Sequence, residues 1–129
     1  MAETDYKHGI RPPYVRKRFH LITDHGVPVE FTIQLEYNRT LISAGPDGWG
    51  PLARFDHNQN AIDGHDVREE GLHLDLLDPD GSKHDVRRGF KYQHIKRYPE
   101  FCEDYLERYC DTLVRDYERR NGIRDGLFS

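Results

Sequence analysis

The stretch VPVEFTIQLEY, residues 27–37, alternates apolar and polar side chains over its whole length. A period of two is typical of a β-strand with one buried and one exposed face. His25-Gly26, directly before it, predicts a tight turn, and the preceding VRKRFHLITD at 15–24 predicts a partner strand. These two strands set the fold class, because the apolar face of a sheet must be covered by another layer.

Three further strands are expected after this hairpin. The first is WGPLARFD at 49–56, which is followed by a polar loop at 57–69. EGLHLDLLD at 70–78 predicts a strand whose leucines share one face. The turn DPDG at 78–81 then returns the chain into SKHDVRRG at 82–89. Short links between successive strands favour an antiparallel meander over a parallel sheet.

The apolar spacing changes after Pro99 from two residues to three or four, which indicates an amphipathic helix. Its apolar stripe consists of Cys102, Leu106, Tyr109, Leu113 and Tyr117. Arg119-Arg120 suit the C-terminal end of a helix, and Gly122 fits just beyond it. The sequence therefore predicts an α+β fold: a four- to five-stranded antiparallel meander sheet with one long C-terminal helix packed on one face.

The length of 129 residues predicts one domain. We expect a flexible N-terminal arm at 1–14, where the residues are polar and end in Arg-Pro-Pro, and a single α+β domain at 15–129. No apolar run is long enough to cross a bilayer, and the first residues do not resemble a signal peptide, so the expected location is cytoplasmic. Cys102 and Cys110 lie eight residues apart on one helix, too far to bridge, and are expected to be reduced packing residues.

Charge is distributed unevenly, although the net charge is only −4. Residues 55–80 are strongly acidic and residues 83–97 are strongly basic. Such blocks neutralise one another across a sheet, or the basic one meets phosphates. Aromatic residues within the basic run either anchor it to the core or stack on the bases of a single strand. The candidate nucleic-acid-binding residues are Arg87, Arg88, Lys91, Lys96 and Arg97.

Three histidines recur at eight-residue intervals within the acidic block. Imidazoles beside carboxylates are ligand types for zinc, manganese or iron, although no spacing here matches a recognised metal signature. The candidate metal ligands are His57, His65, His73 and Asp75. A divalent metal is the one cofactor that the sequence leaves open.

The same residues suit acid–base chemistry on RNA or nucleotides. Strand alternation places His73 and Asp75 on one face, with His73 as the candidate base and Asp75 as its orienting partner. Arg54 on a neighbouring strand would hold an anion. His65 and Asp56 complete this candidate catalytic site. A simpler interpretation stays open, in which these polar residues are the solvated face of a strand and a soluble loop.

The passage ARFDHNQNAIDGHDV, together with LHLDLLDPDG, resembles the TumE-type toxins of prokaryotic toxin–antitoxin operons. The resemblance covers about thirty residues and depends on Arg54, Asp56, His65 and His73. Those toxins tend to place histidines side by side in the loop, whereas this chain has His-Asp. The resemblance implies a compact α+β protein, an antitoxin partner and growth inhibition.

Two functions from different classes follow. The first is a small prokaryotic toxin-like or mobile-element-associated protein that acts on RNA or nucleotides through the His/Asp/Arg site on the sheet face. The second is a non-enzymatic subunit that docks a partner protein through the sheet face or a strand edge.

Overall fold

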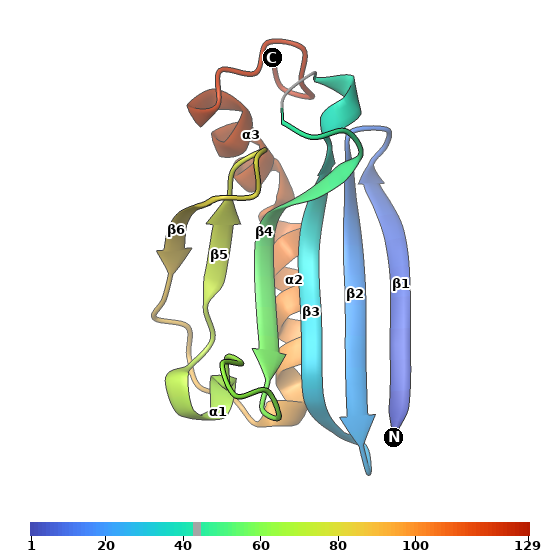
Figure 1. Ribbon diagram of the computed structural model, residues 1–129, viewed down its shortest axis with the longest axis vertical. Helices are drawn as coiled ribbons and strands as arrows, with labels where there is room; N and C mark the ends of the chain where they lie inside the picture. The colour runs from blue at the N-terminus through green and yellow to red at the C-terminus, as the bar shows by residue number, and fades with distance from the viewer. Residues whose placement is uncertain (43–44) are drawn as a thin grey trace.

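The computed structural model describes residues 1–42 and 45–129. Within these residues six strands form one antiparallel sheet in strict chain order, which confirms the α+β class and the meander (Figure 1). The strands are β1 (Ala2–Arg11), β2 (Val15–Asp24), β3 (Val27–Asn38), β4 (Trp49–Asn58), β5 (Leu74–Leu77) and β6 (Lys83–Arg87).

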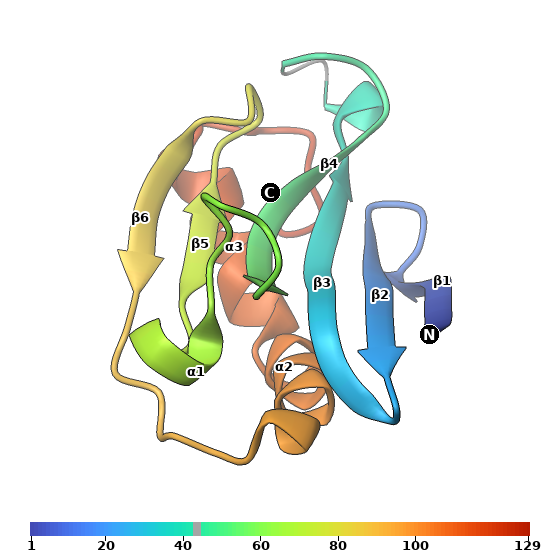
Figure 2. The ribbon, with the colours of Figure 1, turned by 60° about the horizontal axis from the view of Figure 1, so that its bottom comes forward.

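Two helices, α2 (Tyr98–Arg108) and α3 (Cys110–Arg120), cover one face of this sheet (Figure 2). We call the opposite face the open face. A single-turn helix, α1 (Val67–Glu70), lies at the end of the sheet where β4 stops and β5 starts (Figure 1). Short 3₁₀ turns occur at Arg39–Leu41 and Ile95–Arg97. Within the described ranges, no helix has the length and apolar character needed to cross a membrane.

The strand register separates a core face from the open face. Phe19, Ile33 and Phe55 are paired neighbours across β2, β3 and β4, and all three are buried beneath the helices. Successive side chains of a strand point to opposite faces. The adjacent row therefore reaches the open face, where Arg54 of β4 is paired with Asp75 of β5.

The leucine row of the fourth expected strand is buried as predicted. Leu72, Leu74 and Leu76 are each 5% exposed or less. The two cysteines are free and buried, and burial raises the pKa of the Cys110 thiol to about 11. They are therefore packing residues with little thiolate character at neutral pH.

The expected arm at 1–14 is wrong over Ala2–Arg11, because these residues form strand β1, paired with β2 from Ala2↔Thr23 onward. Tyr6 stacks on Phe19 with ring centroids 4.9 Å apart, and its hydroxyl donates to Glu103 of α2. The strand is polar because it is an edge strand, which has a pairing partner on one side only. The sheet therefore has six strands rather than four or five.

The expectation of one long C-terminal helix is also wrong. Tyr109 has φ −101° and ψ 11°, outside helical geometry, and separates α2 from α3. Helix α2 contacts β2 and β3, whereas α3 contacts β4. The break lets each half follow different strands of the sheet. The predicted stripe stays buried at Cys102, Leu106, Leu113 and Tyr117, whereas its fifth member, Tyr109, is 40% exposed because it lies at the break.

Candidate functional site

All five candidate catalytic residues line one cavity of about 380 Å³ on the open face. We call this cavity the open-face pocket. Strand β4 contributes Arg54 and Asp56, and β5 contributes Asp75. His65 comes from the loop after β4, and His73 lies directly before β5. The structure thus brings together residues that are up to 21 positions apart in the sequence.

His57 fixes the loop that carries His65. Its ring is 1% exposed, its Nδ1 accepts a hydrogen bond from the Val67 amide at 3.1 Å, and its Nε2 faces Gln59 Oε1 at 3.3 Å. Burial lowers the pKa of His57, so the ring is neutral at neutral pH. Both nitrogens are already occupied, and His57 is therefore a positioning residue rather than a partner of His65 and His73 in a ligand cluster.

Helix α1 and the glycine after it bring His73 back towards His65. Asp66 is the N-cap of α1 and accepts from the Arg68 amide at 2.9 Å. Hydrogen bonds from Arg68 lower the pKa of Asp66 to about 2. Gly71 ends the helix with φ +80°, a conformation that L side chains rarely adopt. The chain consequently reverses within three residues of Glu70.

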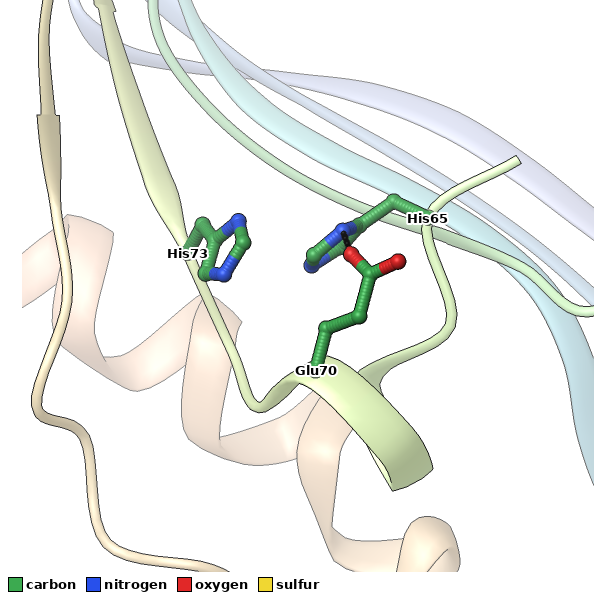
Figure 3. A group of neighbouring side chains, drawn as sticks. All are labelled: His65, Glu70 and His73. Carbon is green, nitrogen blue, oxygen red and sulfur yellow. Dashed lines mark ion pairs between the residues drawn. The ribbon is translucent and has the colours of Figure 1, made fainter. Parts of the chain in front are cut away.

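The rings of His65 and His73 lie with their centroids 4.0 Å apart. Glu70 pairs with Nδ1 of His65 (Figure 3). Nε2 of His65 donates to the Gly71 carbonyl oxygen, 3.1 Å away. His65, Glu70 and His73 each offer one ligand atom, and these three atoms lie within 4.8 Å of one another. Two of the four candidate metal ligands, His65 and His73, therefore lie close together, and Glu70 lies beside them.

His73 is held in its neutral form. Its Nε2 accepts a hydrogen bond from Arg88 Nη1 at 2.6 Å, which places a lone pair on that nitrogen. Burial lowers the pKa of His73, and the neighbouring His65 and Arg88 lower it further. A neutral imidazole is the form that acts as a base or as a metal ligand.

Asp75 does not orient His73 as the sequence suggested. Its carboxylate is 3.5 Å from Arg54 Nη2 and 3.7 Å from Lys83 Nζ, and no hydrogen bond or ion pair within the described residues joins it to His73. The two side chains line the same pocket, but the strand register matches Asp75 with Arg54. Asp75 is therefore a counter-charge for the cations of the pocket.

Arg54 retains an unused donor. Its Nε is buried from solvent and has no hydrogen-bond partner within the described residues, and Asp56 Oδ2 is 3.9 Å away. Arg18, which is paired with Gln34 next to Arg54 on the open face, also has an unpartnered buried Nε, while its Nη2 donates to Asp5 Oδ2 at 3.4 Å. Two guanidinium groups on this face thus hold hydrogen-bonding capacity that the protein does not use.

The candidate nucleic-acid-binding residues do not share one face. Arg88 contacts His73 beside the open-face pocket, whereas Arg87 lines a separate hollow with Asp116 and Arg119 of α3. Lys91, Lys96 and Arg97 are exposed.

The aromatics of the basic run divide between core and solvent. Phe90 packs against Phe55 with centroids 5.5 Å apart, and Tyr98 is 1% exposed. These two are anchors, whereas Tyr92 is 63% exposed.

Glu70 is the residue that the sequence-based interpretation missed. It was placed at the start of a strand, but it is the last residue of α1. The signal was present, because Asp66 is a favoured N-cap residue and Gly71 a favoured residue beyond a helix end. Together they predict a single helical turn over VREE.

Comparison with known proteins gives one match. A family model described as a domain of unknown function, DUF7718, matches residues 1–123. No curated protein and no solved structure matches the chain.

Proposed function

The chain belongs to the DUF7718 family, a domain of unknown function, and from its geometry we propose that it binds and cleaves a phosphate ester of RNA or of a nucleotide in the open-face pocket. In this proposal Arg54 holds the phosphate and His73 supplies the basic lone pair. His65, Asp56 and Asp75 surround the reacting group.

The observation that carries the proposal is the Arg54 guanidinium, which lines the pocket, is 31% exposed and makes no hydrogen bond within the described residues. Its nearest carboxylate oxygens are 3.5 and 3.9 Å away, so a phosphate in the pocket would supply closer acceptors. The planar guanidinium matches the spacing of phosphate oxygens better than an ammonium does. Arg54 lines the pocket that also contains His65 and His73, which puts the anion holder and the histidines in one cavity.

The second arginine favours an extended ligand over a mononucleotide. Arg18 and Arg54 flank Gln34 in adjacent register positions across β2, β3 and β4. An RNA strand that crosses the open face would meet Arg18 with one phosphate and Arg54 with another. The phosphate at Arg54 would then lie beside the histidines.

The chemistry needs a nucleophile, a base and a stabiliser of charge. A ribose hydroxyl or a water molecule would attack phosphorus and pass its proton to His73. The new P–O bond would form as the P–O bond to the leaving group breaks, and solvent would protonate the leaving oxygen. Arg88 would turn from His73 to the incoming phosphate, which frees the Nε2 lone pair for this role.

The test compares the wild-type protein with Arg54→Gln in binding and cleavage of a fluorescent RNA oligonucleotide. We expect binding to weaken roughly ten- to a hundredfold in the variant, because a hydrogen bond to a charged group contributes about 1.5–3 kcal/mol. The control is Arg124→Gln, an exposed residue. It belongs to the segment after α3, which lies at the end of the molecule opposite α1 (Figure 1). Wild-type protein that neither binds nor cleaves RNA or nucleotides at low salt would refute the proposal.

A second candidate is a non-enzymatic docking subunit, which the exposed edge strand β1 favours. This strand is paired only with β2 and is exposed along nearly its whole length. An extended segment of a partner protein would add to it as a further strand. Arg54→Gln separates the candidates, because docking at β1 would be unchanged by a substitution in the pocket.

Toxin-like character and an antitoxin partner stay predictions. They are tested by inducing the chain in a bacterial host and comparing growth with that of a His73→Ala strain. Growth arrest with the wild-type chain alone would support a toxin that uses the pocket.

A further inference from the structure

We propose that His65, Glu70 and His73 bind one zinc ion at the open-face pocket. The ligand atoms come from three short segments: the loop after β4, the end of α1 and the residue before β5. The three side chains are drawn together in Figure 3. The inference deepens the proposed function, on which its catalytic meaning rests, but binding of the ion requires only these three residues.

The donor set is that of a catalytic zinc site. Two imidazole nitrogens and one carboxylate oxygen leave a fourth tetrahedral position for water or substrate. Zinc bonds of about 2.0–2.1 Å place ligand atoms roughly 3.3 Å apart in such a site. The present atoms lie within 4.8 Å of one another, and Glu70 is 52% exposed, so its side chain is free to complete the approach.

The hydrogen bond that His65 makes through Nε2 leaves its Nδ1 as the nitrogen for a metal ion. Its Nε2 donates to the Gly71 carbonyl oxygen at 3.1 Å, which leaves Nδ1 as the nitrogen that faces Glu70. A metal-bound histidine commonly donates its other N–H group to a backbone carbonyl in this way. His65 Nδ1 and the Glu70 carboxylate face each other across the position that the ion would take.

The charge of the pocket also favours a cation. Four carboxylates line it against two cationic side chains; they are Glu30, Asp56, Asp63 and Asp75, against Arg54 and Lys83. Arg88 is a third cation, 2.6 Å from His73 Nε2, and its guanidinium has to turn from the ring when the ion binds. This excess of negative charge weakens the binding of a phosphate that Arg54 holds without a metal ion. A divalent ion at the histidines would offset it and let Arg54 and the ion hold the phosphate together.

Zinc suits the site better than calcium or magnesium, because those ions prefer oxygen ligands only. The other two candidate ligands stay outside the site: His57 is bonded to the Val67 amide, and Asp75 is paired with Arg54. With the ion bound, His73 becomes a ligand. The ion would then supply the basic group, because zinc lowers the pKa of a water molecule that it binds.

The test uses tag-free protein that has been stripped with a chelator. Zinc stoichiometry is measured by mass spectrometry, and cobalt(II) is titrated as a spectroscopic substitute. We expect one zinc per chain and visible cobalt absorption bands of tetrahedral type. Affinity should fall at least a hundredfold in His65→Ala and His73→Ala. It should fall less in Glu70→Gln, which keeps the shape of the side chain.

The matched control is His20→Ala. His20, Glu3 and Asp5 also lie within 4.8 Å of one another, but this group offers one imidazole and two carboxylates, a poorer donor set for zinc. Circular dichroism spectra establish that each variant is folded. The absence of saturable zinc or cobalt binding, or binding lost in His20→Ala and kept in His73→Ala, would overturn the proposal.

The results also separate the ion from the proposed function. RNA binding that depends on Arg54, without zinc binding, would leave the proposed function standing and remove the ion. One zinc per chain without any RNA or nucleotide binding would support the zinc site and refute the proposed function.

Discussion

His65 and His73 face each other at a centroid distance of 4.0 Å because the chain turns back at Gly71. The loop before α1 is fixed from the other side, where the Asn58 amide donates to the His65 carbonyl oxygen at 2.8 Å. The histidine pair therefore depends on backbone conformation as much as on the two side chains. A substitution that disturbs the turn should disturb the site without touching either ring.

Gly71→Ala tests this dependence. Its φ of +80° would strain any L residue, and an added Cβ would lie 3.4 Å from the Tyr92 hydroxyl. We expect a loss of about 1–2 kcal/mol in the free energy of unfolding and weaker zinc binding. Gly81→Ala is the matched control, because Gly81 has φ +87° with open space around it. Both variants should lose stability in urea titrations, and equal zinc affinity in the two would contradict the prediction.

Arg88→Ala should raise the pKa of His73. The substitution removes a nearby positive charge and the donor that holds the Nε2 lone pair. Titration of the His73 ring protons by NMR measures the shift directly. Arg87→Ala is the control, because Arg87 lines the hollow beside α3 instead. An unchanged His73 titration in Arg88→Ala would show that the contact does not persist in solution.

His57 should make the protein less stable as the pH falls. Burial lowers the pKa of His57 in the folded state, so below an unfolded pKa of about 6.5 the unfolded chain binds more protons than the folded one. The free energy of unfolding should therefore decrease from pH 7 to pH 5. His57→Gln should reduce this decrease. His73→Ala is measured in parallel, because the lowered pKa of His73 acts in the same direction.

Tyr37→Phe should destabilise the core near the C-terminus. The Tyr37 hydroxyl donates to Glu118 Oε2 at 2.5 Å, and Glu118 is 2% exposed. Removing one donor from a buried carboxylate costs about 1–3 kcal/mol. Urea unfolding followed by circular dichroism measures the loss. Tyr92→Phe, at a residue that is 63% exposed, should lose almost nothing.

Apolar periodicity was sufficient to predict the strands and helices that bury one face. Residues 15–24 match β2, and 27–37 match β3 to within one residue, because each alternates between the core and the open face. The helical stripe after Pro99 was likewise visible in the sequence. Arg54, Asp56 and Asp75 could be assigned to one polar face because a strand leaves its second face to polar residues.

The remaining features had no periodic signal. Strand β1 buries almost nothing, so its pairing with β2 is hidden in a polar sequence. The break at Tyr109 lies within a continuous apolar stripe and depends on which strands each helix meets. The counter-charge role of Asp75 depends on its register with Arg54, which only the folded sheet defines. Glu70 was hidden because one helical turn is too short for a period to appear.

The order of the strands has a consequence for synthesis of the chain. Each strand meets only its sequence neighbours, so hairpins can form one after another while the chain emerges from the ribosome. The covering helices, residues 98–120, are made after all six strands. If the sheet pairs before they are made, Phe19, Ile33 and Phe55, which the helices bury in the folded protein, are exposed to solvent. We therefore expect the nascent chain to be most prone to aggregation after β6 has been made and before α2 and α3 have been made.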